Sequence, residues 1–293
     1  MKNLLIIFIN LLSFIFINSF DLIELDLSNS VYYQEKYFRF LANNYENINQ
    51  GDFWTSFNDE KAIGFQASRD FGSFLFVKDW SIYSFKLTKI MFRPFCSYKI
   101  KNGDNDIFEC DAELLLYHTI DNNYFPPGKR VYLGINYLII SVPFKRTDYM
   151  DPSSDKLLEF LNLEIYKNVV VEKKNLKIGP YKPIKLYQMI QHQPQYLFEA
   201  KDSISDEKTL YLIFSQYHHI NDRDYVLLKS AYDELNFGEF SNNPIDDFDK
   251  TVVYRNFQNP DELKSRLTLM AYNNQNYFKL KWTILIMLYF ILV

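Results

Sequence analysis

Two short segments of the chain carry charged or sulfur-containing side chains within otherwise apolar runs. The segment IMFR, residues 90–93, contains Met91 and Arg93, and the segment AELLLYH, residues 112–118, contains Glu113 and Leu115. On a β-strand, residues two positions apart lie on the same face, so each segment presents its pair together. A buried arginine stays charged and needs a partner. If the two segments form neighbouring strands, Glu113 is one candidate partner for Arg93.

Other catalytic signatures are absent from the sequence. It contains no Gly-x-Ser-x-Gly, P-loop, His-Glu-x-x-His or Cys-x-x-Cys motif. The histidines are weak candidates for a metal site, because His218 and His219 are adjacent and would face opposite sides of a strand, while His192 lies in a loop-like segment. We therefore favour an interpretation in which these histidines bind no metal.

The elements that position these residues are mainly strands. β-Branched and aromatic residues dominate segments 71–80, 81–95, 96–100, 106–120, 129–145 and 208–217, which predicts strands. Helices are expected over 151–165 and over 221–235, the second capped by Asn221 or Asp222. This pattern predicts an α+β, mainly β class with a large twisted, mostly antiparallel central sheet and short peripheral helices. One domain over residues 20–272 is the simplest organisation.

The strands and their order resemble the alpha-class carbonic anhydrases. LTKIMFR, residues 87–93, stands where that family has Leu-x-x-[IF]-His-x-His, and AELLLYH stands where it has Ala-Glu-x-His-x-x-His on the neighbouring strand. YLIISVPFK, residues 137–145, resembles the family's next strand, and RNFQNPDELKSR, residues 255–266, resembles its closing segment. The resemblance covers residues 85–266 and implies the carbonic anhydrase fold.

The resemblance also implies that the zinc site has been lost. It assigns the three zinc-binding histidines to Met91, Arg93 and Leu115. Leucine has no donor atom, arginine has no free lone pair, and a methionine thioether suits copper rather than zinc. Since a catalytic zinc needs three protein ligands, the resemblance implies no metal, no cofactor and no hydration chemistry. Glu113 matches the glutamate that orients the third histidine, and Lys201 stands at the position of the hydroxide-orienting threonine.

A positive charge in place of the metal is our hypothesis for Arg93. Its expected partner is Glu113 on the next strand or Asp202, because an unpaired buried charge costs several kcal/mol. The alternative is that Arg93 extends to the mouth of the former active-site cone, where water solvates its head group. His118 matches a family histidine that is not a zinc ligand.

The two cysteines, Cys96 and Cys110, flank a predicted hairpin turn, KNGDND, at residues 101–106. In the secretory pathway an isolated pair is expected to form a disulfide, here across one hairpin. The alternative is two buried free thiols.

Both ends of the chain resemble sorting signals. Residues 1–19 have the pattern of a secretory signal peptide, with an uncut transmembrane anchor as the alternative. Residues 273–293 have the pattern of a removed glycosylphosphatidylinositol (GPI) attachment signal, with Asn273 or Asn274 as attachment residue and an apolar tail from Trp282 to Val293. A short tail anchor and a final helix packed in the core are the alternatives.

These features together predict a catalytically inactive carbonic anhydrase-related protein. A GPI lipid would hold it on the lumenal or extracellular face of the cell surface or of a secretory-organelle membrane. It would act as a binding, adhesion or structural module, with a protein or a small molecule as ligand of the metal-free cone. The net charge of −4, with no basic stripe, argues against nucleic acid. The alternative function is an active zinc carbonate dehydratase with a displaced metal site.

Overall fold

Strands make up most of the chain that the computed structural model describes, in agreement with the predicted mainly β class. The described residues are 23–26, 30–32, 38–43, 45–58, 62–78, 81–96, 98–102, 105–121, 135–147, 177–178, 196–202, 208–214, 218–234, 245–246 and 252–255. All of them belong to the first of two units, Met1–Asn256, and none to the second, Phe257–Val293.

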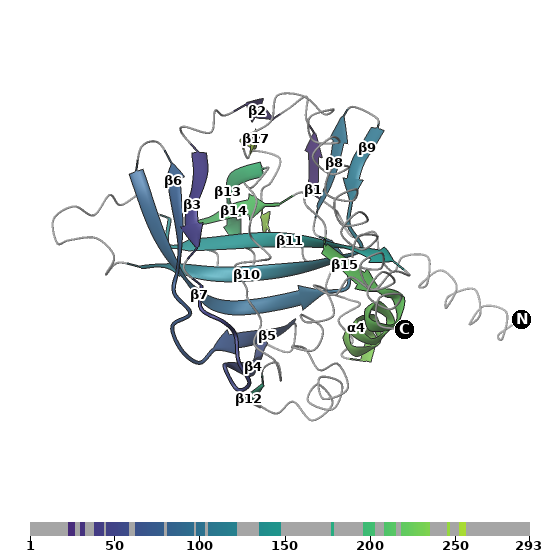
Figure 1. Ribbon diagram of the computed structural model, residues 1–293. Coiled ribbons are helices and arrows are strands. Elements are labelled where there is room, and N and C mark those ends of the chain that lie inside the picture. Colours follow the sequence, from purple (N-terminus) through teal and green to yellow (C-terminus); the bar gives the residue numbers. More distant parts are fainter. Residues whose placement is uncertain are drawn as a thin grey trace, which may run out of the picture. The chain divides into compact units, whose positions relative to one another are not determined.

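A 14-stranded sheet forms the body of this unit (Figure 1). Its main path follows the order β12 (Lys177–Ile178), β4 (Phe53–Asn58), β5 (Ala62–Ala67), β7 (Ser81–Arg93), β10 (Ala112–Ile120), β11 (Tyr137–Thr147), β14 (Lys208–Ile213), β13 (Tyr196–Asp202), β17 (Tyr254–Arg255) and β2 (Val31–Tyr32). Off this path lie β3 (Phe38–Asn43), β6 (Ser73–Lys78), β15 (His218–Asn221) and β16 (Ile245–Asp246).

Most neighbouring strands of this sheet are antiparallel, as predicted. The exceptions among the described pairs are β11 with β14, β11 with β15, and β17 with β2, which are parallel. The sheet is therefore mixed, and its longest strands, β7, β10 and β11, run side by side through its middle (Figure 1).

A second, three-stranded sheet contains β1 (Ile23–Asp26), β8 (Tyr98–Asn102) and β9 (Asn105–Glu109). β8 and β9 pair antiparallel, with Asn102 opposite Asn105, so the predicted hairpin around residues 101–106 is confirmed. β1 pairs in parallel with β8.

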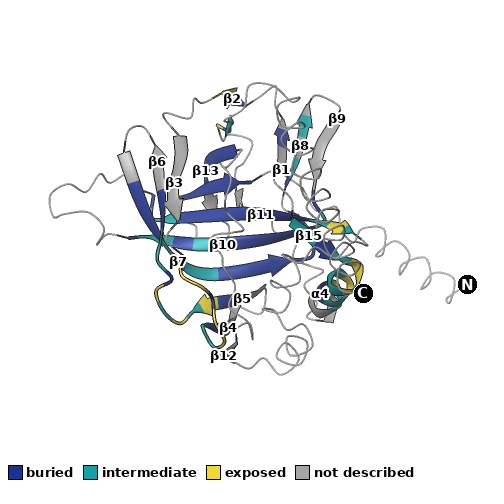
Figure 2. Cartoon of the chain, in the orientation of Figure 1, coloured by how far each residue is buried: buried dark blue, intermediate teal, exposed yellow. Residues whose placement is uncertain are grey.

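The core lies against one face of the large sheet and includes every second residue along the central strands. Ile90 and Phe92 of β7 and Leu114 and Leu116 of β10 belong to it, each at most 1% exposed. Aromatic side chains supply much of its volume, namely Tyr45, Phe53, Phe65, Phe71, Phe74, Tyr83, Phe85, Phe92, Phe144 and Phe214. Figure 2 shows buried residues along most of β10 and β11. Burial of these side chains from water is the main stabilising contribution to such a sheet.

The helix predicted over 221–235 is α4 (Asp222–Glu234). Asn221 caps it, because its Oδ1 accepts a 2.8 Å hydrogen bond from the backbone N–H of Asp224. The Tyr225 hydroxyl donates to the Pro94 carbonyl at 3.1 Å and joins the helix to the end of β7. The helix predicted over 151–165 lies outside the described residues. Within the described ranges, no helix has both the length and the apolar composition needed to cross a bilayer.

Candidate functional site

The residues singled out from the sequence come together on β7 and β10, which are antiparallel neighbours. Met91 lies directly opposite Leu115, and Arg93 lies directly opposite Glu113. Residues facing each other in an antiparallel pair point to the same side of the sheet. All four side chains therefore share one face, as expected from their spacing in the sequence.

This face is opposite the core. Ile90, Phe92 and Leu114 alternate with the four residues and belong to the core cluster, whereas the four do not. We call the surface formed by Met91, Arg93, Glu113, Leu115 and Ser141 the site face; Ser141 of β11 is the register partner of Leu115. The same row of the sheet continues through Ile213 and Tyr196.

The side chains of the site face are buried. Met91 is 0% exposed, Leu115 2%, Glu113 1% and Arg93 8%. Met91 and Leu115 thus fill the positions that the resemblance assigns to two of the three zinc ligands. Because Arg93 is also buried, the alternative in which it extends into water does not describe this structure.

Arg93 makes contacts along its own strand and at the strand's end. Its Nε donates to the Met91 Sδ at 3.3 Å, and its guanidinium carbon lies 5.8 Å from the Phe95 ring centroid. A thioether is a weak acceptor and an aromatic face attracts a cation, so both contacts suit a charge held away from water. Of the two predicted partners, Glu113 is the one in cross-strand register, while the side chain of Asp202 lies outside the described residues.

Glu113 is hydrogen-bonded through a residue that sequence reasoning did not single out. Ser141 Oγ donates to Glu113 Oε1 at 2.6 Å, and the Tyr98 hydroxyl oxygen lies 3.3 Å from Ser141 Oγ. Ser141 has one hydroxyl proton, and the shorter contact assigns it to Glu113. The sequence signal for Ser141 is a lone hydroxyl within the apolar run LIISVPF, residues 138–144.

The predicted disulfide is confirmed: Cys96 and Cys110 are bonded, with their Cα atoms 5.8 Å apart. Cys96 follows the end of β7, and Cys110 precedes the start of β10. Their sulfurs are buried at this strand end, where Cys96 Sγ lies 3.5 Å from the Ala112 carbonyl oxygen. The disulfide therefore closes the β8–β9 hairpin beside the Arg93 and Glu113 pair.

A second row of large side chains continues the site face two residues along each strand. It consists, in register, of Lys89, Tyr117, Ile139, Tyr211 and Phe198. Tyr211 and Phe198 stack with ring centroids 5.1 Å apart, and Lys89 Nζ lies 5.4 Å from the Tyr117 ring centroid. Lys89 and Tyr117 are half-buried, and the other three are buried.

His118 lies on the core side of β10, the same face as Leu114 and Leu116, because alternate residues of a strand share a face. Its Nδ1–H faces the carbonyl oxygens of Leu116 at 2.9 Å and Leu138 at 3.3 Å, and its Nε2 accepts from the Tyr45 hydroxyl at 2.5 Å. Burial lowers its pKa from 6.5 to about 4, although both carbonyl contacts favour the charged form. His118 is therefore a neutral structural residue at pH 7.

His218 and His219 are not among the residues of the site face. His218 and His219 are consecutive residues of β15, next to Phe144 and Lys145 of β11, and His192 lies outside the described residues. Among the residues that the structure describes, no three histidine, cysteine, aspartate or glutamate side chains form a metal-binding group.

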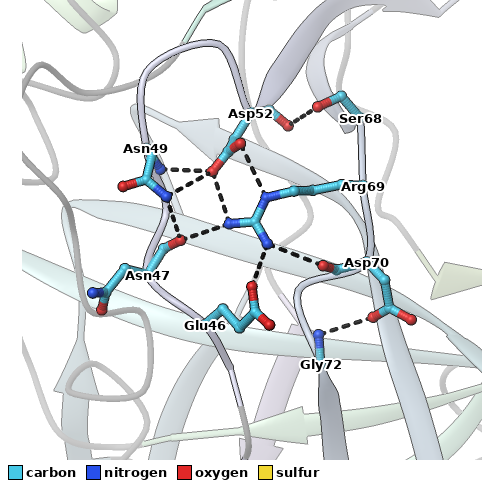
Figure 3. A network of polar contacts seen from close by, with 8 residues as sticks. All are labelled: Glu46, Asn47, Asn49, Asp52, Ser68, Arg69, Asp70 and Gly72. Atoms are coloured by element: carbon cyan, nitrogen blue, oxygen red, sulfur yellow. Dashed lines mark hydrogen bonds and ion pairs between the residues drawn. The ribbon is translucent and has the colours of Figure 1, made fainter.

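A separate polar cluster surrounds Arg69 and joins the loop before β4 to the loop after β5 (Figure 3). Arg69 binds Asp52 through Nε and Nη2, both at 3.0 Å, and binds Glu46 Oε2 through Nη1 at 2.5 Å. Its other two N–H groups donate to the carbonyls of Asn47 and Asp70, so all five donors are used. This geometry cross-links two loops and leaves no donor for a ligand.

Several predicted residues fall where the structure gives no side-chain description. Lys201 belongs to β13, opposite Lys208, and only its backbone is described. Asn273 and Asn274, with the whole of segments 1–19 and 273–293, lie outside the described residues.

No protein-family model matches this sequence, and no curated protein matches it either. Solved structures do. The chain is similar to dioscorin complexed with ascorbate, with 14% identity over 81% of this chain and 86% of that chain and a TM-score of 0.52. It is also similar to an alpha-carbonic anhydrase from Thermovibrio ammonificans in complex with the inhibitor sulfanilamide, with 12% identity, coverage of 80% and 85%, and a TM-score of 0.45.

At these identities the likeness concerns the fold alone. The observed architecture, one large twisted mixed sheet with a helix at its side, is the carbonic anhydrase-like fold expected from the sequence.

Proposed function

We propose that this protein is a non-catalytic member of the carbonic anhydrase-like fold that acts as a binding, adhesion or structural module. One observation carries the proposal. The three positions that the sequence resemblance assigns to zinc ligands hold Met91, Arg93 and Leu115, and two of these have no nitrogen or oxygen donor in their side chains. Carbonic anhydrase chemistry uses a zinc-bound hydroxide as its nucleophile. These three positions supply no set of ligands that would hold the zinc ion.

The packing of the site face supports the same proposal. Arg93 is a permanent cation in the place of a divalent one, it contacts the Met91 thioether, and Met91 and Leu115 are both buried. A second cation beside this guanidinium would be repelled by its charge. The arrangement therefore disfavours a divalent metal in two ways, through its donors and through its charge.

The ends of the sequence support a membrane-held location. A signal peptide at residues 1–19 and a GPI signal at residues 273–293 would place the domain on the lumenal or extracellular face of a membrane. The confirmed disulfide is consistent with this compartment, because disulfides persist where the surroundings are oxidising.

The test is a carbon dioxide hydration assay on the purified protein supplied with excess zinc. We expect the rate to equal that of buffer with zinc alone. A rate above that background that a sulfonamide inhibitor abolishes would replace this proposal with the alternative, an active enzyme with a displaced metal site.

A further inference from the structure

A row of four side chains crosses four neighbouring strands of the large sheet, on the face opposite the core. In register from strand to strand, it consists of Trp54 of β4, Gln66 of β5, Lys89 of β7 and Tyr117 of β10. Each of these strand pairs is antiparallel, so all four side chains point to the same side of the sheet. We call these four side chains the Trp54 row. Beside each of them along its strand lies a core residue, namely Phe53, Phe65, Ile90 or Leu116.

The Trp54 row is accessible to solvent at its β4 end. Trp54 is 44% exposed and Gln66 is also exposed, whereas Lys89 and Tyr117 are half-buried. The adjacent row of the same face, which contains Met91, is buried. Neighbouring strands of a sheet lie about 4.8 Å apart, so the four side chains span about 14 Å. On the Met91 side, the accessible surface is therefore bounded along the length of the row.

The order of the side chains places aromatic rings at both ends of the row and hydrogen-bonding groups between them. The Trp54 indole offers a large, rigid, apolar surface at a small cost in conformational entropy. The Gln66 amide both donates and accepts hydrogen bonds, and the Lys89 ammonium has three donors. Lys89 Nζ lies 5.4 Å from the Tyr117 ring centroid, which places this cation at the Tyr117 end. None of the four side chains is a carboxylate, so the row suits a ligand rich in acceptor oxygens.

The size, position and charge of the Trp54 row argue against several classes of partner. A stable protein interface needs about 800 Å² on each partner, far more than one row of four side chains offers. An extended peptide adds to a sheet through the backbone of an edge strand, whereas β5, β7 and β10 lie inside the main path of this sheet. Nucleic acid needs several cations, and the row has one. A slender, uncharged ligand with ring faces and hydroxyl groups fits best.

We propose that the Trp54 row binds a neutral oligosaccharide. A pyranose ring has an apolar face of C–H groups, which stacks on the Trp54 indole, because the face of an aromatic ring is electron-rich. The hydroxyl groups around the edge of the sugar exchange hydrogen bonds with Gln66 and accept them from Lys89. This inference rests on the proposed binding function and names the class of ligand that the module binds.

Isothermal titration of the full chain with cellohexaose, chitohexaose and laminarihexaose tests the site. We expect one of these sugars to bind, and Trp54→Ala to weaken its binding about tenfold, which is the order expected for the loss of one aromatic contact. Trp54→Phe keeps a ring and should bind more tightly than Trp54→Ala. Tyr32→Ala is the matched control, because Tyr32 is 39% exposed but lies on β2 at the other end of the main path. Its affinity should equal that of the wild type.

Three results would overturn the sugar site. The first is no binding of any of the three sugars, and the second is equal affinity of Trp54→Ala and the wild type. The third is binding of dextran sulfate alone that high salt abolishes, because the row would then only attract anions through Lys89. These failures are distinguishable from failure of the proposed function, which would appear as carbon dioxide hydration. A protein that neither hydrates carbon dioxide nor binds these sugars contradicts the sugar site alone.

Discussion

Ser141 on β11 donates a 2.6 Å hydrogen bond to the buried carboxylate of Glu113 on β10. In the family that the sequence resembles, the corresponding glutamate orients a zinc-binding histidine, whereas here the residue beside it on the same face is Leu115. A buried carboxylate that lost its histidine would be costly without a replacement donor. The serine hydroxyl supplies that donor, so Glu113 has a structural role without a metal.

Ser141→Ala should therefore destabilise the protein by about 1–3 kcal/mol, the usual contribution of a hydrogen bond to a charged or buried group. Urea denaturation followed by tryptophan fluorescence measures it. Ser84→Ala is the matched control, because Ser84 is 0% exposed and its Oγ has no hydrogen-bond partner among the described residues. That control should be neutral or stabilising. Equal losses in the two variants would show that the Ser141 hydrogen bond contributes nothing.

His118 makes stability depend on pH. Its folded pKa, about 4, lies below the unfolded value of 6.5, so between these values the unfolded chain binds the additional proton. The stabilising contribution is complete above pH 6.5 and is lost as the pH falls toward 4. At 1.36 kcal/mol per pKa unit the loss amounts to about 3 kcal/mol.

The measurement is the urea midpoint of the wild type and of His118→Asn from pH 7 to pH 4. The variant should be less stable at pH 7 and should lose less stability on acidification, because asparagine does not titrate. A wild-type curve parallel to that of the variant would assign the acid sensitivity to carboxylates elsewhere.

The Arg69 cluster should tolerate loss of the Glu46 carboxylate better than loss of the Asp52 carboxylate. Burial alone raises the pKa of Asp52, yet its hydrogen bonds with Arg69 and Asn49 outweigh this and hold the pKa below its usual value. The Asp52 side chain is 13% exposed and binds Arg69 at two points, whereas that of Glu46 is 66% exposed. We expect Asp52→Asn to cost about 1–2 kcal/mol and Glu46→Gln less than about 0.5 kcal/mol. Thermal unfolding compares them, and the reverse order would contradict the geometry.

The assignment of Met91, Arg93 and Leu115 to former zinc positions can be tested by restoring histidines. Since the three positions share one face, the triple variant Met91→His/Arg93→His/Leu115→His should bind one zinc ion per chain. Adding Glu113→Gln should weaken binding about 10- to 100-fold, the usual effect of losing a carboxylate that orients a metal-binding histidine. Isothermal titration measures both. A folded triple variant without zinc affinity would show that the three positions were wrongly assigned.

The predicted GPI anchor at Asn273 or Asn274 can be tested by measuring whether a lipase releases the protein from membranes. Phosphatidylinositol-specific phospholipase C should move the protein from the membrane pellet to the supernatant. Alkaline carbonate alone should not, because the lipid stays inserted. Retention in the pellet after lipase treatment would favour the alternative of a peptide tail anchor.

The sequence was sufficient for features that depend on local pattern. The apolar runs at 87–93 and 112–118 are neighbouring strands, KNGDND lies in a hairpin, and Asn221 caps a helix, as predicted. The disulfide followed from cysteine count and hairpin spacing. Each of these features depends on residues that are close in the sequence or on the pairing of two strands.

Contacts that depend on register across several strands could not be predicted. Ser141 reaches Glu113 only because β11 pairs with β10 so that Ser141 faces Leu115, and no local pattern determines that register. The irregularity that places Leu87, rather than Thr88, opposite His118 also follows from no local pattern. The sequence did not decide whether Glu113 or Asp202 is the partner of Arg93, because only the strand register places Glu113 opposite Arg93.

The most direct test of the account is the zinc content of the protein purified from its native source without chelators, measured by elemental analysis against protein concentration. The account predicts a zinc-to-protein ratio close to zero, unchanged after incubation with zinc and gel filtration. A ratio close to one that survives gel filtration would contradict it, because the protein would then hold a metal that Met91, Arg93 and Leu115 cannot bind.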